Sequence, residues 1–322
     1  MPTTLRCDPK LFDKDLTGQV IIVTGANSGC GLETTRQLAK QGATVILACR
    51  NEAKAKAAMD DIGYADKTSF IQLDLSDLGS VRKFVESFTS AYERLDVLVN
   101  NAGIMACPYA KTKDGFEIQI GCNHLAHFLL FNLLAPLLIK TAEDTGKPSR
   151  FISLSSCAAS ELSIGSAGYA DIDFDDLNWE SRKYDTGSAY QQSKLANFLI
   201  AWEASKKYDS SKLICASLHP GWVRSNLDQH VLSSGFFGTV LRNMFQWSGN
   251  MIPAVDGAQT TLHCVLNDAA DMESGAFYSQ FGIYKDKSAR KGGWPMALPN
   301  PNATPEAATK LWEESEKLVG AL

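Results

Sequence analysis

The sequence predicts an α/β fold, a doubly wound parallel sheet with helices on both faces. Short apolar runs alternate with amphipathic segments along the chain, as in repeated strand–helix–strand units. The apolar runs are almost continuous in Val, Ile and Leu, as expected for strands covered on both faces. A glycine-rich turn joins the first apolar run to the first amphipathic segment. We predict strands at 20–24, 44–48, 69–73, 96–99, 151–154 and 213–218, and helices at 31–41, 52–62, 78–92, 114–141 and 189–207.

The domain organisation follows from length and composition. The chain has 322 residues, 45% of them hydrophobic, which one large α/β unit can accommodate in a single core. The sequence has no internal repeat at the period of a solenoid or propeller. It also has no linker that would separate two domains. We expect an N-terminal arm at 1–17 and one domain at 18–322, with a cofactor half at about 18–155 and a catalytic and substrate half at about 156–322. A last helix is predicted at 305–319.

Composition argues against several classes of protein. The chain has 31 Lys and Arg against 36 Asp and Glu, a net charge of −5, so we expect no nucleic-acid partner. Its eight cysteines are irregularly spaced without a CxxC pair, which favours reduced thiols in the cytoplasm over disulfides or a zinc ribbon, and we predict no metal site. No signal peptide or transmembrane segment is expected, because the longest apolar stretch, 128–139, has only 12 residues.

A candidate phosphate-binding loop lies at the end of the first strand. Free N–H groups and the dipole at the start of a helix favour a bound anion. Gly25 permits the tight turn, Gly29 lets the backbone approach a pyrophosphate, and Gly31 lets the helix pack close to the sheet. A glycine pattern alone is weak evidence, but its place in the first strand–helix unit predicts a dinucleotide site of Rossmann type. The loop reads Thr24-Gly25-Ala26-Asn27-Ser28-Gly29-Cys30-Gly31, and we include Asn27 and Ser28 in the site.

Arg50 predicts which nicotinamide cofactor is bound. It follows the second predicted strand, where an acidic residue would accept a hydrogen bond from a ribose 2′-hydroxyl and an arginine would accommodate a 2′-phosphate. The sequence there is Leu47-Ala48-Cys49-Arg50-Asn51, without a carboxylate. We therefore predict NADP(H) rather than NAD(H). The alternative is a solvated surface arginine.

An ordered series of motifs resembles the short-chain dehydrogenase/reductase family. The resemblance runs from Thr24 to about Ser225 and is nearest to the retinol-dehydrogenase-like branch, which shares the pattern of Asp114-Gly115-Phe116-Glu117 and Asn123-His124-Leu125-Ala126-His127-Phe128. Besides the glycine turn and Asn123, the motifs are Leu73-Asp74-Leu75, Asn100-Asn101-Ala102-Gly103, Ser155-Ser156, Tyr190-Gln191-Gln192-Ser193-Lys194 and Pro220-Gly221-Trp222-Val223-Arg224-Ser225.

The resemblance implies further cofactor contacts. Asp74 is expected at the adenine edge with Leu75 behind it, and Asn101 is expected beside the adenosine ribose. The nicotinamide carboxamide is expected to contact Val223 and Ser225, where the family often carries Thr. The remaining expected cofactor contacts are Gly103, Tyr190 and Lys194.

Four residues are predicted to be catalytic. Tyr190 and Lys194 are four apart on a predicted helix and so share a face. A phenol has a pKa near 10, and a neighbouring ammonium lowers that pKa, which makes the phenol a better proton donor to a developing alkoxide. Ser156 is expected to hold the substrate oxygen. By resemblance, Asn123 supports a water that links Lys194 to solvent.

The expected reaction interconverts a carbonyl and an alcohol with NADP(H). Apolar residues recur at helical spacing along 236–247, which favours a lipophilic substrate such as a retinoid, a steroid or a fatty aldehyde. That segment could be a lid, a peripheral membrane contact or core packing. Family members often form homo-oligomers through two long helices, here 114–141 and 189–207, although the C-terminal tail could cover that face.

Two other functions remain open at this point. A protochlorophyllide-reductase-like enzyme would share Tyr190 and Lys194, and 274–279 resembles that branch. Trp222, where that branch typically has Cys, and the Ser155-Ser156 pair count against it. A non-catalytic NADP-binding regulatory protein would keep the cofactor site and lose the chemistry, but the predicted catalytic set is intact.

Overall fold

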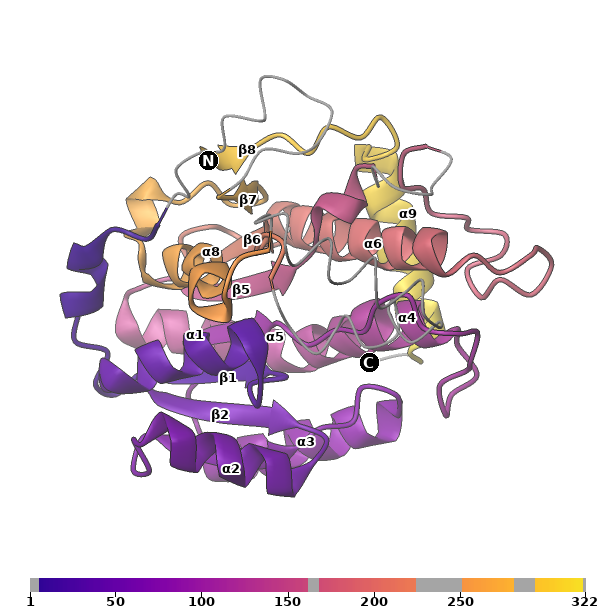
Figure 1. The fold of residues 1–322 in the computed structure, drawn as a ribbon. Coiled ribbons are helices and arrows are strands. Elements are labelled where there is room, and N and C mark those ends of the chain that lie inside the picture. The colour runs from indigo at the N-terminus through magenta and orange to yellow at the C-terminus, as the bar shows by residue number, and fades with distance from the viewer. Residues whose placement is uncertain (1–5, 162–167, 224–250, 281–292, 321–322) are drawn as a thin grey trace.

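One mostly parallel sheet organises the molecule (Figure 1). The structure is a computed structural model and describes residues 6–161, 168–223, 251–280 and 293–320. Within these ranges eight strands pair in the order β3-β2-β1-β4-β5-β6-β7-β8, and only β8 runs antiparallel to its neighbour. The strands are β1 (Val20–Thr24), β2 (Thr44–Cys49), β3 (Thr68–Gln72), β4 (Val97–Asn100), β5 (Ser149–Leu154), β6 (Leu213–His219), β7 (Phe277–Ser279) and β8 (Gly293–Met296).

The strand order reverses direction between β1 and β4. The chain winds outward from β1 through β2 to β3, then returns to pair β4 with the other side of β1. A crevice forms outside the carboxyl ends of the strands at such a point, and ligands of doubly wound sheets bind there. The glycine turn and the Asn101 turn follow these two strands, so the topology brings them together at that crevice.

Helices cover both faces of the sheet, as predicted (Figure 1). The longer helices are α1 (Gly29–Lys40), α2 (Glu52–Ile62), α3 (Leu78–Ala91), α5 (Ala126–Thr145), α6 (Thr186–Lys207), α8 (Ala254–Leu266) and α9 (Pro305–Leu318). Alternate residues of β1 enter two separate cores: Ile21 and Val23 pack with α1, α2 and α8, whereas Ile22 packs with α3, α5, α6 and α9. The fold class predicted from the sequence is therefore confirmed.

The predicted long helix at 114–141 is wrong at its start. Gly115 has a φ of +91°, which ends regular structure there. The Glu117 carboxylate then accepts the N–H groups of Gln119 at 2.9 Å and Ile120 at 2.8 Å, so the helix begins at Ile118. It continues through α4 (Ile118–Ile120), the π-helical turn η2 (Gly121–Leu125) and α5.

Two strands and one α-helix were not predicted from the sequence. β7 has three residues and β8 has four, both too short for a period-two pattern to be recognised. α8 has a glycine and three consecutive polar residues in its middle, and these are buried against α1 and β6. Its apolar periodicity is therefore weak although the helix is inside the molecule.

The N-terminal segment packs onto α1 and α8. Its 3-10 helix, η1 (Pro9–Asp13), is followed by Lys14, whose ammonium donates to the Leu266 carbonyl at 2.7 Å. The buried Cys7 donates its N–H to the Gln259 side chain at 3.1 Å. The described part of the predicted arm thus belongs to the folded body.

The segment Ile118–Thr145 is apolar enough, by length and composition alone, to span a membrane. In the structure 67% of its most apolar window is buried, and α5 packs on α3 and β5. A core helix with such burial passes the same test, so this segment is weak evidence for a membrane span. It is the one such helix in the ranges that the structure describes.

The C-terminal helix α9 lies on the helices that the sequence proposed for oligomer contacts (Figure 1). Trp312 is 3% exposed and packs edge-on against Phe128 of α5, with ring centroids 5.1 Å apart. The buried His124 and Ser315 are joined by a 2.7 Å hydrogen bond. A face of α5 and α6 is therefore covered within the chain.

We predict that Trp312→Ala lowers the free energy of unfolding by about 3–5 kcal/mol, because the variant loses a large buried side chain and leaves a cavity. Urea unfolding followed by circular dichroism measures this change. Val255→Ala removes methyl groups from a side chain that is 51% exposed and should stay within about 0.5 kcal/mol of the parent protein. A loss below about 1 kcal/mol for Trp312→Ala would show that α9 is not part of the core.

Candidate active site

The glycine turn forms a cradle that side chains would fill. Gly25 has a φ of +64°, and a Cβ there would lie 3.0 Å from the Cα of Ala102. A Cβ on Gly31 would lie 2.5 Å from the Asn101 Nδ2 and 2.7 Å from the Gly25 carbonyl oxygen. Ser28 is the N-cap of α1 but makes no side-chain capping bond, so the first N–H groups of α1 are available to a ligand. The turn therefore fits the diphosphate of a dinucleotide.

Thr24 ties this turn to the loop after β4. Its Oγ accepts the N–H groups of Asn101 and Ala102, each at 2.9 Å. The Asn101 side chain returns a bond to the Thr24 carbonyl at 2.7 Å. Asn101 thus lies beside the glycine turn, where the resemblance placed an adenosine ribose.

Cys49, at the end of β2, supports the turn and was not predicted from the sequence. Its buried sulfur accepts hydrogen bonds from the backbone of Asn27 and Ala26, and burial raises its pKa to about 11. In the sequence, only its place next to Arg50 indicates that Cys49 lies near the cofactor site.

The predicted adenosine contacts follow the ends of β2 and β3. Arg50 is exposed and comes directly after β2. The partly buried Asp74 accepts the N–H of Ser76 at 2.9 Å and its hydroxyl at 2.7 Å, and Leu75 packs on the α3 side of the core. These side chains lie at the same edge of the sheet as the glycine turn.

Lys194 is the charged centre of the site. It is 5% exposed, its Nζ donates to the Leu154 carbonyl at 3.0 Å, and it lies 5.7 Å from the ring centroid of Tyr190. A Cβ on Gly103 would come within 3.3 Å of this Nζ, so the missing side chain leaves room for the ammonium. Burial lowers the pKa of Lys194 to about 8, because the charged form loses hydration.

The two serines after β5 have different positions. Ser155 donates its hydroxyl to the Lys194 carbonyl at 2.6 Å and so fixes the backbone of α6. Ser156 is 8% exposed and caps the short helix η3 (Cys157–Ala159) by accepting the Ala158 N–H at 3.1 Å. Its hydroxyl donates to the Cys157 sulfur at 3.9 Å, a long contact to a weak acceptor that a substrate oxygen could replace.

Asn123 lies in the π-helical turn η2. Its side chain accepts the Ile104 N–H at 2.8 Å, donates to the Ile104 carbonyl at 2.9 Å and donates to the Ser193 hydroxyl at 2.9 Å. Its Oδ1 would also lie 3.4 Å from a Cβ on Gly103. Single π turns inside helices are frequent at functional sites, and this one brings Asn123 next to Lys194.

Trp222 and Val223 approach the site from the segment after β6. Trp222 hydrogen-bonds the Cys157 sulfur beside Ser156. Val223 forms a bridge with Ile252, and its Cγ2 would lie 2.3 Å from a Cβ on Gly257, so α8 holds it at close range. Ser225 and the predicted apolar segment 236–247 lie outside the described residues.

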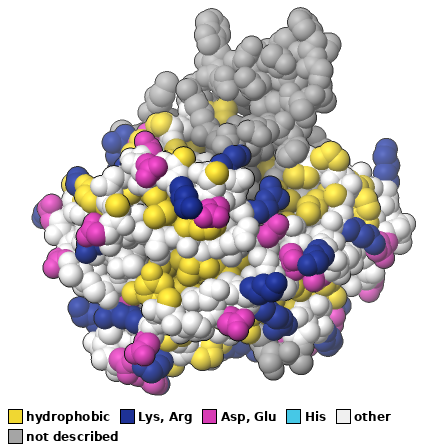
Figure 2. Space-filling model, turned by 90° about the horizontal axis from the view of Figure 1, so that it is seen from below, with side chains coloured by type: hydrophobic (Ala, Val, Ile, Leu, Met, Phe, Trp, Pro, Cys, Tyr) yellow, Lys and Arg dark blue, Asp and Glu magenta, His cyan; other side chains and the backbone are white. Residues whose placement is uncertain are grey.

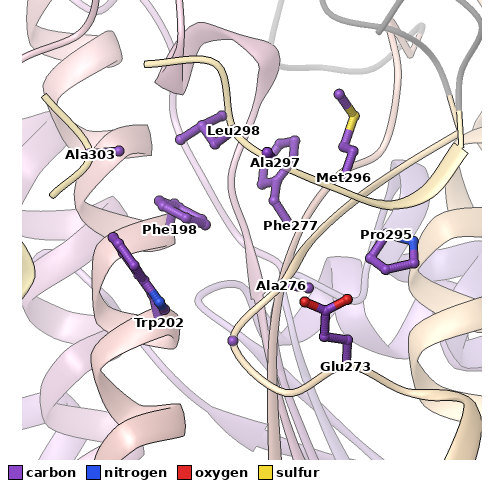
Figure 3. Close-up of a pocket in the computed structure, with 11 residues that line it drawn as sticks. Phe198, Trp202, Glu273, Ala276, Phe277, Pro295, Met296, Ala297, Leu298 and Ala303 are labelled. Carbon is purple, nitrogen blue, oxygen red and sulfur yellow. The ribbon is translucent and has the colours of Figure 1, made fainter. Parts of the chain in front are cut away.

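A separate cavity lies between α6 and the β7–β8 pair (Figure 3). Its volume is about 390 Å³, and Phe198 and Trp202 face Met296 and Leu298 across it. None of the predicted catalytic or cofactor residues lines it. We assign this cavity no part in the chemistry.

Surface charge gives no sign of a polyanion site on the face drawn in Figure 2. Basic and acidic side chains are interspersed there with small hydrophobic patches, and neither charge forms a continuous field.

We predict that Lys194→Met stabilises the protein by about 3 kcal/mol at pH 7, because the lowered pKa of the buried ammonium means that charging it costs folding free energy. The Leu154 carbonyl keeps its 2.9 Å bond from Asn197 in this variant. The parent's free energy of unfolding should rise between pH 8 and about 10, where the unfolded state binds more protons, and the variant should lack that rise. Lys147→Met, at an exposed position, is the control. Equal pH profiles for parent and Lys194→Met would contradict the prediction.

Comparison with known proteins agrees with this architecture. The short chain dehydrogenase family model matches residues 19–170. Retinol dehydrogenase 13 of Homo sapiens is 41% identical over 310 residues, covering 95% of this chain and 86% of the relative. Retinol dehydrogenase 12 of Homo sapiens is 39% identical over 308 residues, covering 95% and 87%. A crystal structure of an uncharacterized protein from Mycobacterium paratuberculosis has a TM-score of 0.73 at 33% identity and covers 98% of each chain.

The sheet order, the glycine cradle and these relatives lead to one assignment. The chain belongs to the short-chain dehydrogenase/reductase family, in its retinol-dehydrogenase-like branch, and is a carbonyl/alcohol oxidoreductase.

Proposed function

We propose that the protein reduces a lipophilic aldehyde or ketone with NADPH, or carries out the reverse oxidation, with Tyr190 as the proton donor. The observation that carries this proposal is the meeting of Lys194, Asn123 and Gly103 at the carboxyl edge of the sheet, with the Tyr190 ring 5.7 Å from the ammonium. These residues come from α6, η2 and the loop after β4, and they converge beside the glycine turn.

The side chains have different roles toward the substrate oxygen. Ser156 donates its hydroxyl proton in a hydrogen bond to the carbonyl oxygen and orients that oxygen. The Lys194 ammonium stabilises the negative charge left on the Tyr190 phenol oxygen as the phenol transfers its proton to the substrate oxygen. When bound, the nicotinamide supplies or accepts the hydride. Asn123 holds the loop that borders Lys194, so the ammonium keeps its position.

The cofactor proposal depends on the cradle and on Arg50. The glycine turn accommodates a diphosphate, and the free N–H groups of α1 favour its charge. Arg50, exposed at the end of β2, supplies a cation where a ribose 2′-phosphate would lie. This supports NADP(H) over NAD(H).

The substrate proposal draws on the relatives. The two relatives from Homo sapiens are named retinol dehydrogenases, which supports an isoprenoid or similarly apolar alcohol or aldehyde. The eight cysteines are free, and seven of them are buried, which supports a reducing, cytoplasm-like compartment.

A substrate panel tests the function directly. Retinal-like, steroid and small polar carbonyls are each assayed with NADPH and with NADH. We expect higher kcat/KM for the apolar carbonyls, and for NADPH over NADH. Preferential turnover of polar carbonyls would overturn the lipophilic assignment, and reduction of protochlorophyllide only under light would favour a protochlorophyllide-reductase-like enzyme.

Arg50→Ala should raise KM for NADPH and leave KM for NADH unchanged.

We predict that Tyr190→Phe lowers kcat by about 10²–10⁴-fold, the usual contribution of a positioned acid. The Kd for NADPH, measured by fluorescence, should remain within about twofold, because the aromatic packing of the ring is kept. Tyr169→Phe, at a position 51% exposed, is the matched control and should keep parental activity. NADPH binding without turnover in the parent protein itself would instead indicate a regulatory protein.

A further inference from the structure

His127 is a buried side chain that the proposed chemistry does not use. It lies in the first turn of α5 and is 3% exposed. Both ring nitrogens have partners: Nε2 lies 2.9 Å from the Thr24 hydroxyl and Nδ1 lies 3.0 Å from the Asn123 carbonyl oxygen. The imidazole therefore bridges the end of β1 and the π-helical turn η2.

The hydrogen bonds around Thr24 determine the tautomer of this ring. The Thr24 hydroxyl oxygen already accepts two N–H groups, from Asn101 and Ala102. Its two lone pairs are thereby occupied, so its own proton must be donated, and Nε2 of His127 is the acceptor. The ring proton is then on Nδ1 and is donated to the Asn123 carbonyl.

The electrostatic surroundings keep the ring neutral. Burial, opposed by the bond to the Asn123 carbonyl and assisted by the nearby Lys194 ammonium, lowers the pKa of His127 to about 4. His124, on the same helix, is also buried, and its pKa is lowered to about 3. A neutral imidazole is the one form that donates at one nitrogen and accepts at the other.

We propose that His127 is a positioning residue with two separable arms. The Nε2 arm orients the Thr24 hydroxyl, which holds the loop of Asn101 beside the glycine turn. The Nδ1 arm fixes the backbone of Asn123. The Asn123 side chain bonds Ile104, which follows Gly103, so this arm also positions the loop against which Lys194 lies. This role rests on the proposed function and deepens it, because it names the residue that holds the glycine turn in position relative to the catalytic side chains.

Two substitutions separate the arms. In Asn the amide nitrogen can take the place of Nδ1, so His127→Asn keeps the Asn123 arm and loses the Thr24 arm. In Gln the amide oxygen can reach the place of Nε2, so His127→Gln keeps the Thr24 arm and loses the Asn123 arm. The two variants carry the same functional group and differ only in its reach.

The expected result is a double dissociation. His127→Gln should lower kcat about tenfold, the equivalent of one lost hydrogen bond, and keep the Kd for NADPH within about twofold. His127→Asn should weaken NADPH binding about fivefold and keep kcat at saturating NADPH within about threefold. His124→Asn removes the bond from a buried imidazole to Ser315 and should lower only the midpoint of thermal unfolding. Parallel losses in kcat and Kd for both His127 variants, or a change in thermal stability alone, would overturn the proposal.

A measurement independent of turnover completes the test. Nitrogen-15 NMR of histidine-labelled protein, assigned with the His124→Asn and His127→Asn variants, should show His127 protonated at Nδ1 at pH 7. The Nε2-protonated tautomer or a charged ring would overturn the proposal. If the parent protein reduces no carbonyl, the proposed function fails, whereas the tautomer and the NADPH Kd still decide the role of His127.

Discussion

A buried ammonium is the constraint around which this site is built. Lys194 is almost fully removed from water, and its Nζ donates to the Leu154 carbonyl. Burying a charge with so little compensation opposes folding. The contacts that position Lys194 are made to groups around the ammonium. Ser155 bonds the Lys194 backbone carbonyl, and Gly103 has no side chain to occupy the space of the ammonium. Asn123 bonds the backbone of the loop on the other side of the ammonium. The same lack of compensation leaves the ammonium free to act on the Tyr190 phenol.

Much of the fold was predictable because its signals are local. The strand at Val20–Thr24 and the helix at Glu52–Ile62 lie where the sequence placed them, since apolar runs and caps define them within a few residues. Tyr190, Lys194 and Asn123 also lie close together, because i and i+4 spacing on one helix fixes the first two without knowledge of the rest of the chain. Which roles these residues have remains a prediction that the kinetic experiments address.

The rest depends on contacts between distant segments. The helix at Ala254–Leu266 is buried by α1, so its polar residues hide its periodicity from the sequence. Cys49 supports the glycine turn through bonds to backbone groups more than twenty positions earlier, and His127 bonds Thr24, which lies 103 positions earlier in the sequence. The spacing of residues along the sequence does not reveal contacts between positions this far apart. These residues meet only when the sheet has formed.

The bond between His124 and Ser315 also has a consequence for how the chain folds. It joins residues 191 positions apart, at the start of the core helix and near the end of the last helix. During synthesis, Phe128 and Phe131 on α5 therefore lack their partner Trp312 until helix α9 has also left the ribosome. An apolar surface that stays exposed for that long is a site for chaperone binding, and contacts of such high sequence separation slow folding.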